Sequence, residues 1–412
     1  MSRLNRRNMD KPTISAEMPQ KHKKLRIVLI VVLLALGATL IATSVADFLT
    51  VDPGWSTISV SLKDSCSGDF VFQYYLGASG KAPNLEQRQV TSIYSQAAGE
   101  AYQIFHTEQL WDNVHNVAYL NAHPNETVQV PEALYRAFRL LENTRCLYLA
   151  PIYGRYVGMF MSEGDWVAET YDPNKNPAAA TFFSEVLAFT NDEAAVKLEL
   201  LENNQVRLCV SESYLQYAQT QEITAFIDFY WMKNAFIADY LADVLISAGY
   251  RNGNLSSFDG FVRNLDNTDL SYRLNIFDRV GNDRYSAAAM EYKKVGAFVA
   301  LRNYPTSNLA VGQYYKWADG TFTSCHIDPA TGLSKSACND LLGYSRTLSC
   351  SEILVAMLPH YVKDQWDSTS ADTLKTQGVE IVYCENHEIF ASDSGVTFVN
   401  LYKDDKVTYK KH

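Results

Sequence analysis

The chain has 412 residues, of which 47% are hydrophobic and 12% aromatic, and it carries 46 acidic against 36 basic side chains, a formal net charge of −10. This composition excludes a disordered or fibrous chain, and the length is ample to bury a large core. The acidic balance argues against nucleic acid as a partner.

The N-terminal segment differs from the rest of the chain in charge and hydropathy. The first 26 residues hold eight basic and two acidic side chains, and an uncharged, mostly apolar run follows over residues 27–46. About 20 such residues, rising roughly 1.5 Å each, span the hydrocarbon core of a membrane. Because positive charge stays on the cytoplasmic side, we expect a basic cytoplasmic tail over 1–26, a transmembrane anchor over 27–46, a linker over 47–64 and an exported domain over 65–410.

A cleaved signal peptide is the alternative for the same segment, because Ser44, Val45 and Ala46 form a small-x-small cleavage pattern. The apolar run is longer than the roughly 7–15 residues of a signal-peptide core, which favours the retained anchor. In both cases the main domain is predicted to be extracytoplasmic, and an anchor makes it a single-pass protein of the cell membrane. Without the first 26 residues the chain holds 28 basic and 44 acidic residues, a formal charge of −16.

All seven cysteines follow the apolar run. Export permits disulfides, and the odd number means that at least one thiol is free or pairs between chains. The spacing of the cysteines matches no zinc-binding pattern. Their pairing stays open at this stage.

Helical and strand patterns are mixed along the rest of the chain. Without regular alternation of strand and helix, they predict an α+β fold and not a doubly wound sheet, and the lack of an internal linker favours one integrated region. The predicted helices cover residues 85–106, 131–143, 229–248 and 350–363, and the predicted strands cover 69–76, 196–201, 205–210, 296–303, 308–316 and parts of 378–402.

Residues 326–332 read His-Ile-Asp-Pro-Ala-Thr-Gly. This string resembles the HIIDPxTG signature of the FAD:protein FMN transferase family, the ApbE-like flavin transferases. On its own it is equally typical of an Asp-Pro turn, because Asp, Pro, Thr and Gly are all turn residues.

Further segments resemble the same family in the same order along the chain. Residues 115–121 (HNVAYLN) are similar to its SEISRLN segment, residues 228–239 (DFYWMKNAFIAD) to DLGGIAKGYAAD, and residues 351–356 (SEILVA) to ADALAT. Together the matches extend over about 65–400. The resemblance implies an ApbE-like fold of helices and antiparallel sheet, with FAD as the substrate, FMN moved to a threonine of an exported acceptor protein, and Mg²⁺ as the metal.

The resemblance also implies site residues, which carry over position by position. The implied flavin-binding residues are Trp111, Asp228, Asn234, His326, Ile327, Asp328 and Thr331, and the implied metal ligand is Glu352. Each has a structural alternative. Trp111 can be a core residue, Asp228 can cap the following helix, and His326 can be a buried structural histidine.

This sequence departs from the family where the ligand would lie. Tyr230 and Trp231 stand in place of a glycine pair, Asn234 in place of a basic residue, and Ala356 in place of a metal-binding threonine. Glycine permits close approach of the backbone to a ligand, and Mg²⁺ demands well-placed oxygen ligands. We therefore expect Mg²⁺ binding to be weak or lost.

Three functions remain open at this stage. The first is an active, membrane-tethered FMN transferase with an altered site. The second is a non-catalytic relative that binds flavin or a flavinylated partner, and the third is a surface protein that retains only the fold. A carbohydrate-binding protein is a further alternative, since the chain is rich in tyrosine.

Overall fold

The computed structural model describes residues 23–49, 51–266, 268–310 and 312–412, and the chain divides into two compact units, Met1–Asp52 and Pro53–His412. In the first unit, helix α1 covers Lys23–Leu49 and contains the predicted anchor. Within the part of the chain that was described, no helix is both long and apolar enough to cross a membrane. Most of the predicted cytoplasmic tail, residues 1–22, lies outside the described residues.

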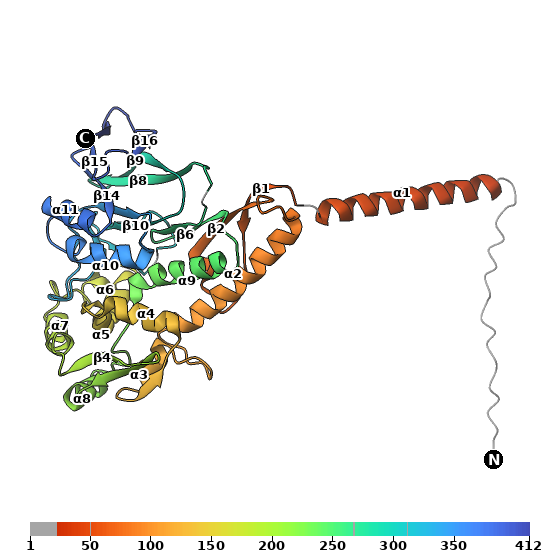
Figure 1. Cartoon of the computed structure of the whole chain (residues 1–412). Coiled ribbons are helices and arrows are strands. Elements are labelled where there is room, and N and C mark those ends of the chain that lie inside the picture. Colours follow the sequence, from red (N-terminus) through yellow and green to blue (C-terminus); the bar gives the residue numbers. More distant parts are fainter. Residues whose placement is uncertain (1–22, 50, 267, 311) are drawn as a thin grey trace, which may run out of the picture. The chain divides into compact units, whose positions relative to one another are not determined.

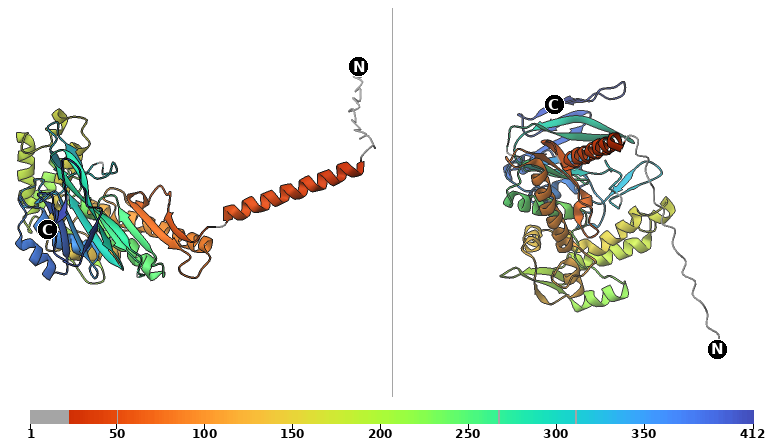
Figure 2. Two further views of the ribbon diagram at one scale, coloured as in Figure 1. Left: turned by 90° about the horizontal axis from the view of Figure 1, so that it is seen from above. Right: turned by 90° about the vertical axis from the view of Figure 1, so that its right-hand side faces the viewer.

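The second unit is organised around a nine-stranded sheet (Figures 1 and 2). Its neighbouring strands pair antiparallel, except for the parallel pair at one edge. The predicted mixture of helices and antiparallel sheet is therefore confirmed. In spatial order the strands are β1 (Gly54–Ile58), β2 (Phe70–Leu76), β6 (Gly253–Ser257), β7 (Phe261–Asn264), β10 (Gly296–Arg302), β13 (Asp340–Ser345), β14 (Glu380–Glu385), β15 (Glu388–Ala391) and β17 (Lys410–Lys411).

Three helices cover one face of this sheet: α2 (Pro83–Phe105), α9 (Lys233–Ser247) and α10 (Cys350–Tyr361) (Figure 1). The sheet is shaped for this contact at Gly343, where an added Cβ would collide with the Met357 sulfur of α10. Helix α4 (Glu132–Leu141) packs beside α2 and α10, and α11 (Thr369–Thr376) packs on α10 and β14. Buried apolar side chains fill the layer between helices and sheet.

A second, three-stranded sheet covers the other face of the strands near the C-terminus. It contains β8 (Tyr272–Val280), β9 (Asp283–Tyr292) and β16 (Thr397–Val399). Ile276, Ala288 and Met290 from this sheet join Phe298 and Val382 of the large sheet in one buried apolar cluster. Two layers of sheet and one of helices therefore form this half of the unit.

The remaining elements build a smaller, mostly helical region at the other end of the unit (Figure 1). This region lines the cleft described below, and a short hairpin packs next to it. It contains α3 (Val117–Ala122), β3 (Thr127–Gln129), α5 (Ala150–Phe160), α6 (Asp165–Ala168), α7 (Pro177–Thr190), β4 (Val196–Leu200), β5 (Gln205–Val210) and α8 (Glu212–Thr220), and the hairpin is β11 (Tyr314–Lys316) with β12 (Phe322–Ser324).

The predicted helices and most of the predicted strands are confirmed, with two corrections. The strand expected over 308–316 is confined to Tyr314–Lys316, and the helix expected over 229–248 begins only at Lys233. A 3-10 turn over Tyr230–Met232 precedes the helix, and Tyr230 has a positive φ of 45°, outside the range of an α-helix.

Candidate functional site

A cleft of about 1070 Å³ lies among α3, α5, α7 and the segment that precedes α9. Its wall includes Tyr153, Arg155 and Phe182 from the helical region, and Asp228 and Tyr230 from the segment that resembles DLGGIAKGYAAD. A volume of this order suits a small organic ligand or nucleotide. The cleft is therefore the candidate binding site.

The chain leading into Asp228 is held in place by Asn121, at the C-terminal end of α3. The buried Asn121 side chain accepts hydrogen bonds from the backbone N–H groups of Phe226 (2.9 Å) and Ile227 (3.1 Å) and donates one to the Ile227 carbonyl (3.0 Å). The Asp228 N–H donates to the Leu147 carbonyl at 2.9 Å. These bonds satisfy a buried extended segment and fix where Asp228 meets the cleft.

Asp228 is half-buried, and burial raises the pKa of its carboxyl group to about 6, an increase opposed by the hydrogen bond from the Tyr230 N–H and by the charge of Lys233. Its Oδ1 accepts that N–H at 2.8 Å. The carboxyl group can therefore gain or lose a proton near neutral pH, and it can serve a ligand as donor or acceptor.

Tyr230 fills the position where the resembling family has its first glycine. Its φ of +45° is a left-handed conformation that favours glycine and that side chains rarely adopt. The ring stacks on Tyr153 with centroids 4.8 Å apart, and the hydroxyl donates to the Gly312 carbonyl at 2.7 Å. The side chain thus occupies space that glycine would leave empty. Val311, which precedes Gly312, lies outside the described residues.

Several buried polar atoms near this tyrosine have no hydrogen-bond partner. Gln313 follows Gly312, and its Nε2 lies 3.5 Å from Asp259 Oδ2, which also accepts from Asn234 Nδ2 at 2.9 Å. Asn234 Oδ1, Asp259 Oδ1 and the Trp231 indole nitrogen are buried and unpartnered among the described residues. Burial raises the pKa of Asp259 to about 6. Unpartnered groups of this kind are costly and mark a place where water or a ligand completes the bonding.

His326 lies behind Trp231. The two rings meet edge to face at 4.6 Å, Tyr361 contacts the imidazole from another side at 5.0 Å, and Nδ1 lies 3.1 Å from the Ser324 hydroxyl. Burial lowers the pKa of His326 to about 3, so the ring is neutral at physiological pH. Ile327 beside it is fully buried.

The rest of the family-like string 326–332 forms a turn around Asp328. Asp328 accepts hydrogen bonds from the Ala330 N–H (3.0 Å) and the Thr331 hydroxyl (2.8 Å), and Lys335 pairs with it at 3.1 Å. Burial raises the pKa of Asp328, but these hydrogen bonds and the lysine outweigh it and hold the pKa below its usual value. The side chains of Asp328 and Thr331 thus bond to each other within the turn. Their role in flavin binding stays a prediction.

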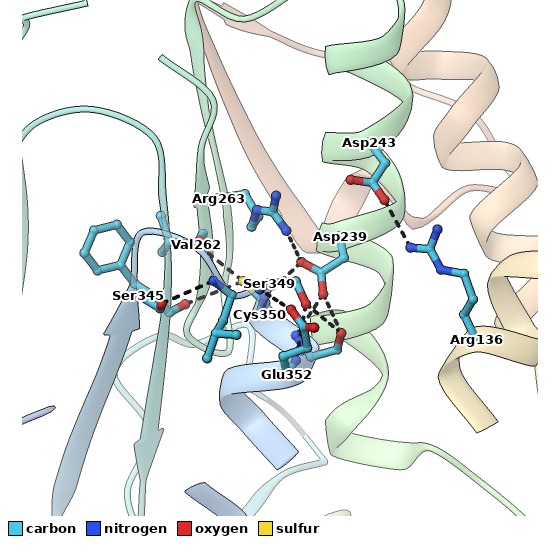
Figure 3. Close-up of polar contacts among 12 residues, drawn as sticks. Arg136, Asp239, Asp243, Val262, Arg263, Ser345, Ser349, Cys350 and Glu352 are labelled. Atoms are coloured by element: carbon cyan, nitrogen blue, oxygen red, sulfur yellow. Dashed lines mark hydrogen bonds and ion pairs between the residues drawn. The ribbon is translucent and has the colours of Figure 1, made fainter. Parts of the chain in front are cut away.

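The predicted metal ligand Glu352 lies at the start of α10, shown in Figure 3. Its carboxylate accepts the Ser349 N–H at 2.8 Å, while the Ser349 hydroxyl accepts the Glu352 N–H at 3.3 Å, which together form a capping box. The neighbouring Asp239 is buried. It pairs with Arg263 and accepts the N–H groups of Cys350 (2.9 Å) and Ser351 (2.8 Å). These two carboxylates hold the helix end.

The residues in this region do not fit a magnesium ion. Ala356 offers no side-chain oxygen, and the Glu352 carboxylate is committed to the cap. Across the described ranges, no three His, Cys, Asp or Glu side chains are grouped so that they could hold a metal. Mg²⁺ requires several oxygen ligands in near-octahedral geometry.

Trp111 does not share the cleft wall with Asp228. Its neighbours Glu108 and Leu110 line the cleft, whereas the indole packs edge-on against Tyr102 (5.9 Å) and His106 (5.3 Å). Of the predicted residues, the structure thus brings Asp228, Asn234 and His326 around the Tyr230–Trp231 pair, and it places Trp111, Thr331 and Glu352 apart from them.

The cleft residues that the sequence prediction missed include Asn121, Tyr153, Arg155 and Phe182. Asn121 lies inside the HNVAYLN match and could have been found there. Tyr153 belongs to α5, for which the sequence analysis predicted no helix, so no signal singled it out.

No protein-family model matches this sequence, and no curated protein matches it significantly. Solved structures do resemble it. The ApbE protein of Thermotoga maritima matches with a TM-score of 0.52 at 14% identity, over 84% of this chain and 97% of that one. Two structures of the flavin transferase ApbE from Vibrio cholerae, one of them a mutant, match with TM-scores of 0.51 and 0.53 at 14% and 16% identity, over 85% and 82% of this chain and 98% of each of theirs.

This chain has the ApbE fold. The resemblance of its sequence to the ApbE-like flavin transferases is thereby confirmed at the level of the fold, with strong divergence in sequence.

The cleft wall of this ApbE-like chain combines aromatic rings with the Asp228 carboxyl group and the Arg155 guanidinium, so it offers apolar, polar and cationic contacts to a ligand. Next to them, Tyr230 and Trp231 fill the space that a glycine pair would leave open.

Proposed function

We propose that this protein binds a flavin in the cleft beside Asp228 and Tyr230, as an ApbE-like protein without metal-dependent transfer. The observation that carries the proposal is this cleft of about 1070 Å³, with aromatic side chains and a carboxyl group whose pKa is raised to about 6 in its wall. The capped Glu352 and the missing oxygen at Ala356 argue against the transfer step, which needs a metal to neutralise the pyrophosphate.

FMN transfer from FAD to a threonine of an exported acceptor protein is the second candidate. It draws on the preserved string 326–332 and on the ApbE fold. We further propose that the protein is tethered to the membrane through residues 27–46, with the flavin-binding unit outside. This rests on the uncharged run and the basic residues before it.

Flavin titration of the purified full-length chain tests the proposal. We expect the fluorescence of FMN or FAD to be quenched on binding and the affinity to be independent of Mg²⁺. Covalent FMN on a threonine-containing acceptor after incubation with FAD and Mg²⁺ would instead establish the second candidate. Asp228→Ala should weaken flavin binding, and Asp243→Ala, at an exposed ion pair with Arg136, serves as its control.

A further inference from the structure

Arg155 is a cation in the cleft wall, and it forms no ion pair with a carboxylate of the residues that the structure describes. Its guanidinium carbon lies 4.3 Å from the centroid of the Phe182 ring, and the side chain is half-buried. Glu108, Glu222 and Asp228 line the same cleft, yet among the described residues none of them forms an ion pair with Arg155. A guanidinium held by stacking alone keeps its N–H donors available for an anion.

The cleft is open at the turn of α5 that carries this side chain. Gly154 precedes Arg155 and also lines the cleft, and a Cβ added to it would meet no atom within 4 Å. The buried ring of Phe182 restricts the Arg155 guanidinium. The side chain therefore loses less conformational entropy when its N–H groups bind a ligand. The acidic residues of the cleft disfavour an anion elsewhere, so the Arg155 end is where a phosphate would lie.

We propose that Arg155 binds a phosphate group of the flavin ligand, so that the cleft selects flavin nucleotides over riboflavin. This inference rests on the proposed flavin binding and adds a specificity-determining residue to it. The phosphate can be the monoester of FMN or the diphosphate of FAD, because both present oxygens that a guanidinium binds in bidentate fashion. Tyr230 closes the neighbouring space by its bond to Gly312, which favours the shorter nucleotide.

The test compares riboflavin, FMN and FAD on the full-length chain and on Arg155→Met. The wild-type chain should bind FMN at least tenfold more tightly than riboflavin. Arg155→Met should weaken FMN binding at least tenfold and leave riboflavin binding within twofold of wild type. Inorganic phosphate should compete with FMN but not with riboflavin. Tighter binding of FMN than of FAD would identify the monoester as the source, and the reverse order would identify the diphosphate.

Arg279→Met is the matched control, because Arg279 is also half-buried and also lies over aromatic rings, those of Tyr304 and Phe322, but outside this cleft. It should leave all three affinities unchanged. If Arg155→Met weakens riboflavin and FMN equally, or leaves FMN binding intact, the role of Arg155 is wrong while flavin binding stands. If no flavin binds to the wild-type chain, the proposed function fails and this inference fails with it.

Discussion

The two segments that carry the resemblance to the ApbE-like family preserve different things. Residues 326–332 keep most side chains of the motif, and Asp328 accepts hydrogen bonds from the same turn. Within residues 228–235, Tyr230 has the left-handed backbone that suits a glycine, but its side chain and that of Trp231 fill the space. The difference shows that a backbone conformation can be present without the glycine that favours it, where packing and hydrogen bonds hold the larger side chain.

Removal of the cap of α10 should cause the largest loss of folding stability. Asp239→Ala should destabilise the protein by about 3–5 kcal/mol, because it leaves Arg263 buried without its partner and removes acceptors from the start of the helix. Urea denaturation measures this loss. Asp243→Ala, which removes an exposed ion pair with Arg136, should cost about 1 kcal/mol or less. Equal losses for both variants would contradict the structural role of Asp239.

Substitutions at Tyr230 test whether this residue of segment 228–235 has the left-handed backbone conformation that favours glycine. Both Tyr230→Ala and Tyr230→Gly remove the stacked ring, at a cost of about 2–4 kcal/mol each. At most positions glycine is the less stable of the two, but at φ +45° it should be more stable than alanine by about 1 kcal/mol. Thermal or urea unfolding of the pair measures the difference. A more stable alanine variant would show that this backbone conformation is not retained in solution.

The carboxyl groups of Asp228 and Asp259 should make the free energy of unfolding depend on pH. The pKa values of Asp228 and Asp259 are raised to about 6 in the folded protein, so between about pH 4 and 6 the folded state binds more protons than the unfolded state. Their contribution to stability is then fully present below about pH 4 and is lost as the pH rises through 6, by about 1–2 kcal/mol per group. Asp259→Asn should flatten this part of the profile in urea titrations at several pH values. An unchanged profile would mean that Asp259 ionises normally.

A substitution in the turn over residues 326–332 should have the smallest effect on stability. Thr331→Val removes the exposed hydroxyl that donates to Asp328 and should cost about 0.5–1 kcal/mol without changing flavin affinity. Parallel measurements of unfolding and of flavin titration check both parts. A large loss of flavin binding would show that Thr331 contacts the ligand, as the family resemblance predicts, and that its role is more than local.

Much of the fold could be predicted because its signals are local. The apolar spacing of α2 and α4 and the alternation along β2 and β5 appear directly in the sequence. The β8–β9 hairpin and helices α5 to α7 were not predicted. The buried face of α5 includes Pro151, Tyr153 and Tyr156, and the pattern that predicts a helix is weak there.

The site could be predicted only where a matched motif covers it. Asp228 and Asn234 lie near each other because the DLGGIAKGYAAD-like segment is continuous in sequence. The engagement of Glu352 in a capping box and the stacking of Arg155 on Phe182 depend on tertiary contacts, which no spacing in one sequence reveals. That Tyr230 faces Tyr153 was likewise beyond the sequence, because the two belong to segments about 77 positions apart.

Flavin binding in the cleft without a metal can be tested by titrating the full-length chain with FMN and FAD, with and without Mg²⁺. We expect saturable quenching of flavin fluorescence with the same affinity in both conditions, weakened by Asp228→Ala. Binding that tightens at least tenfold with Mg²⁺ would contradict the loss of the metal site, and the absence of any binding would contradict the proposed function as a whole.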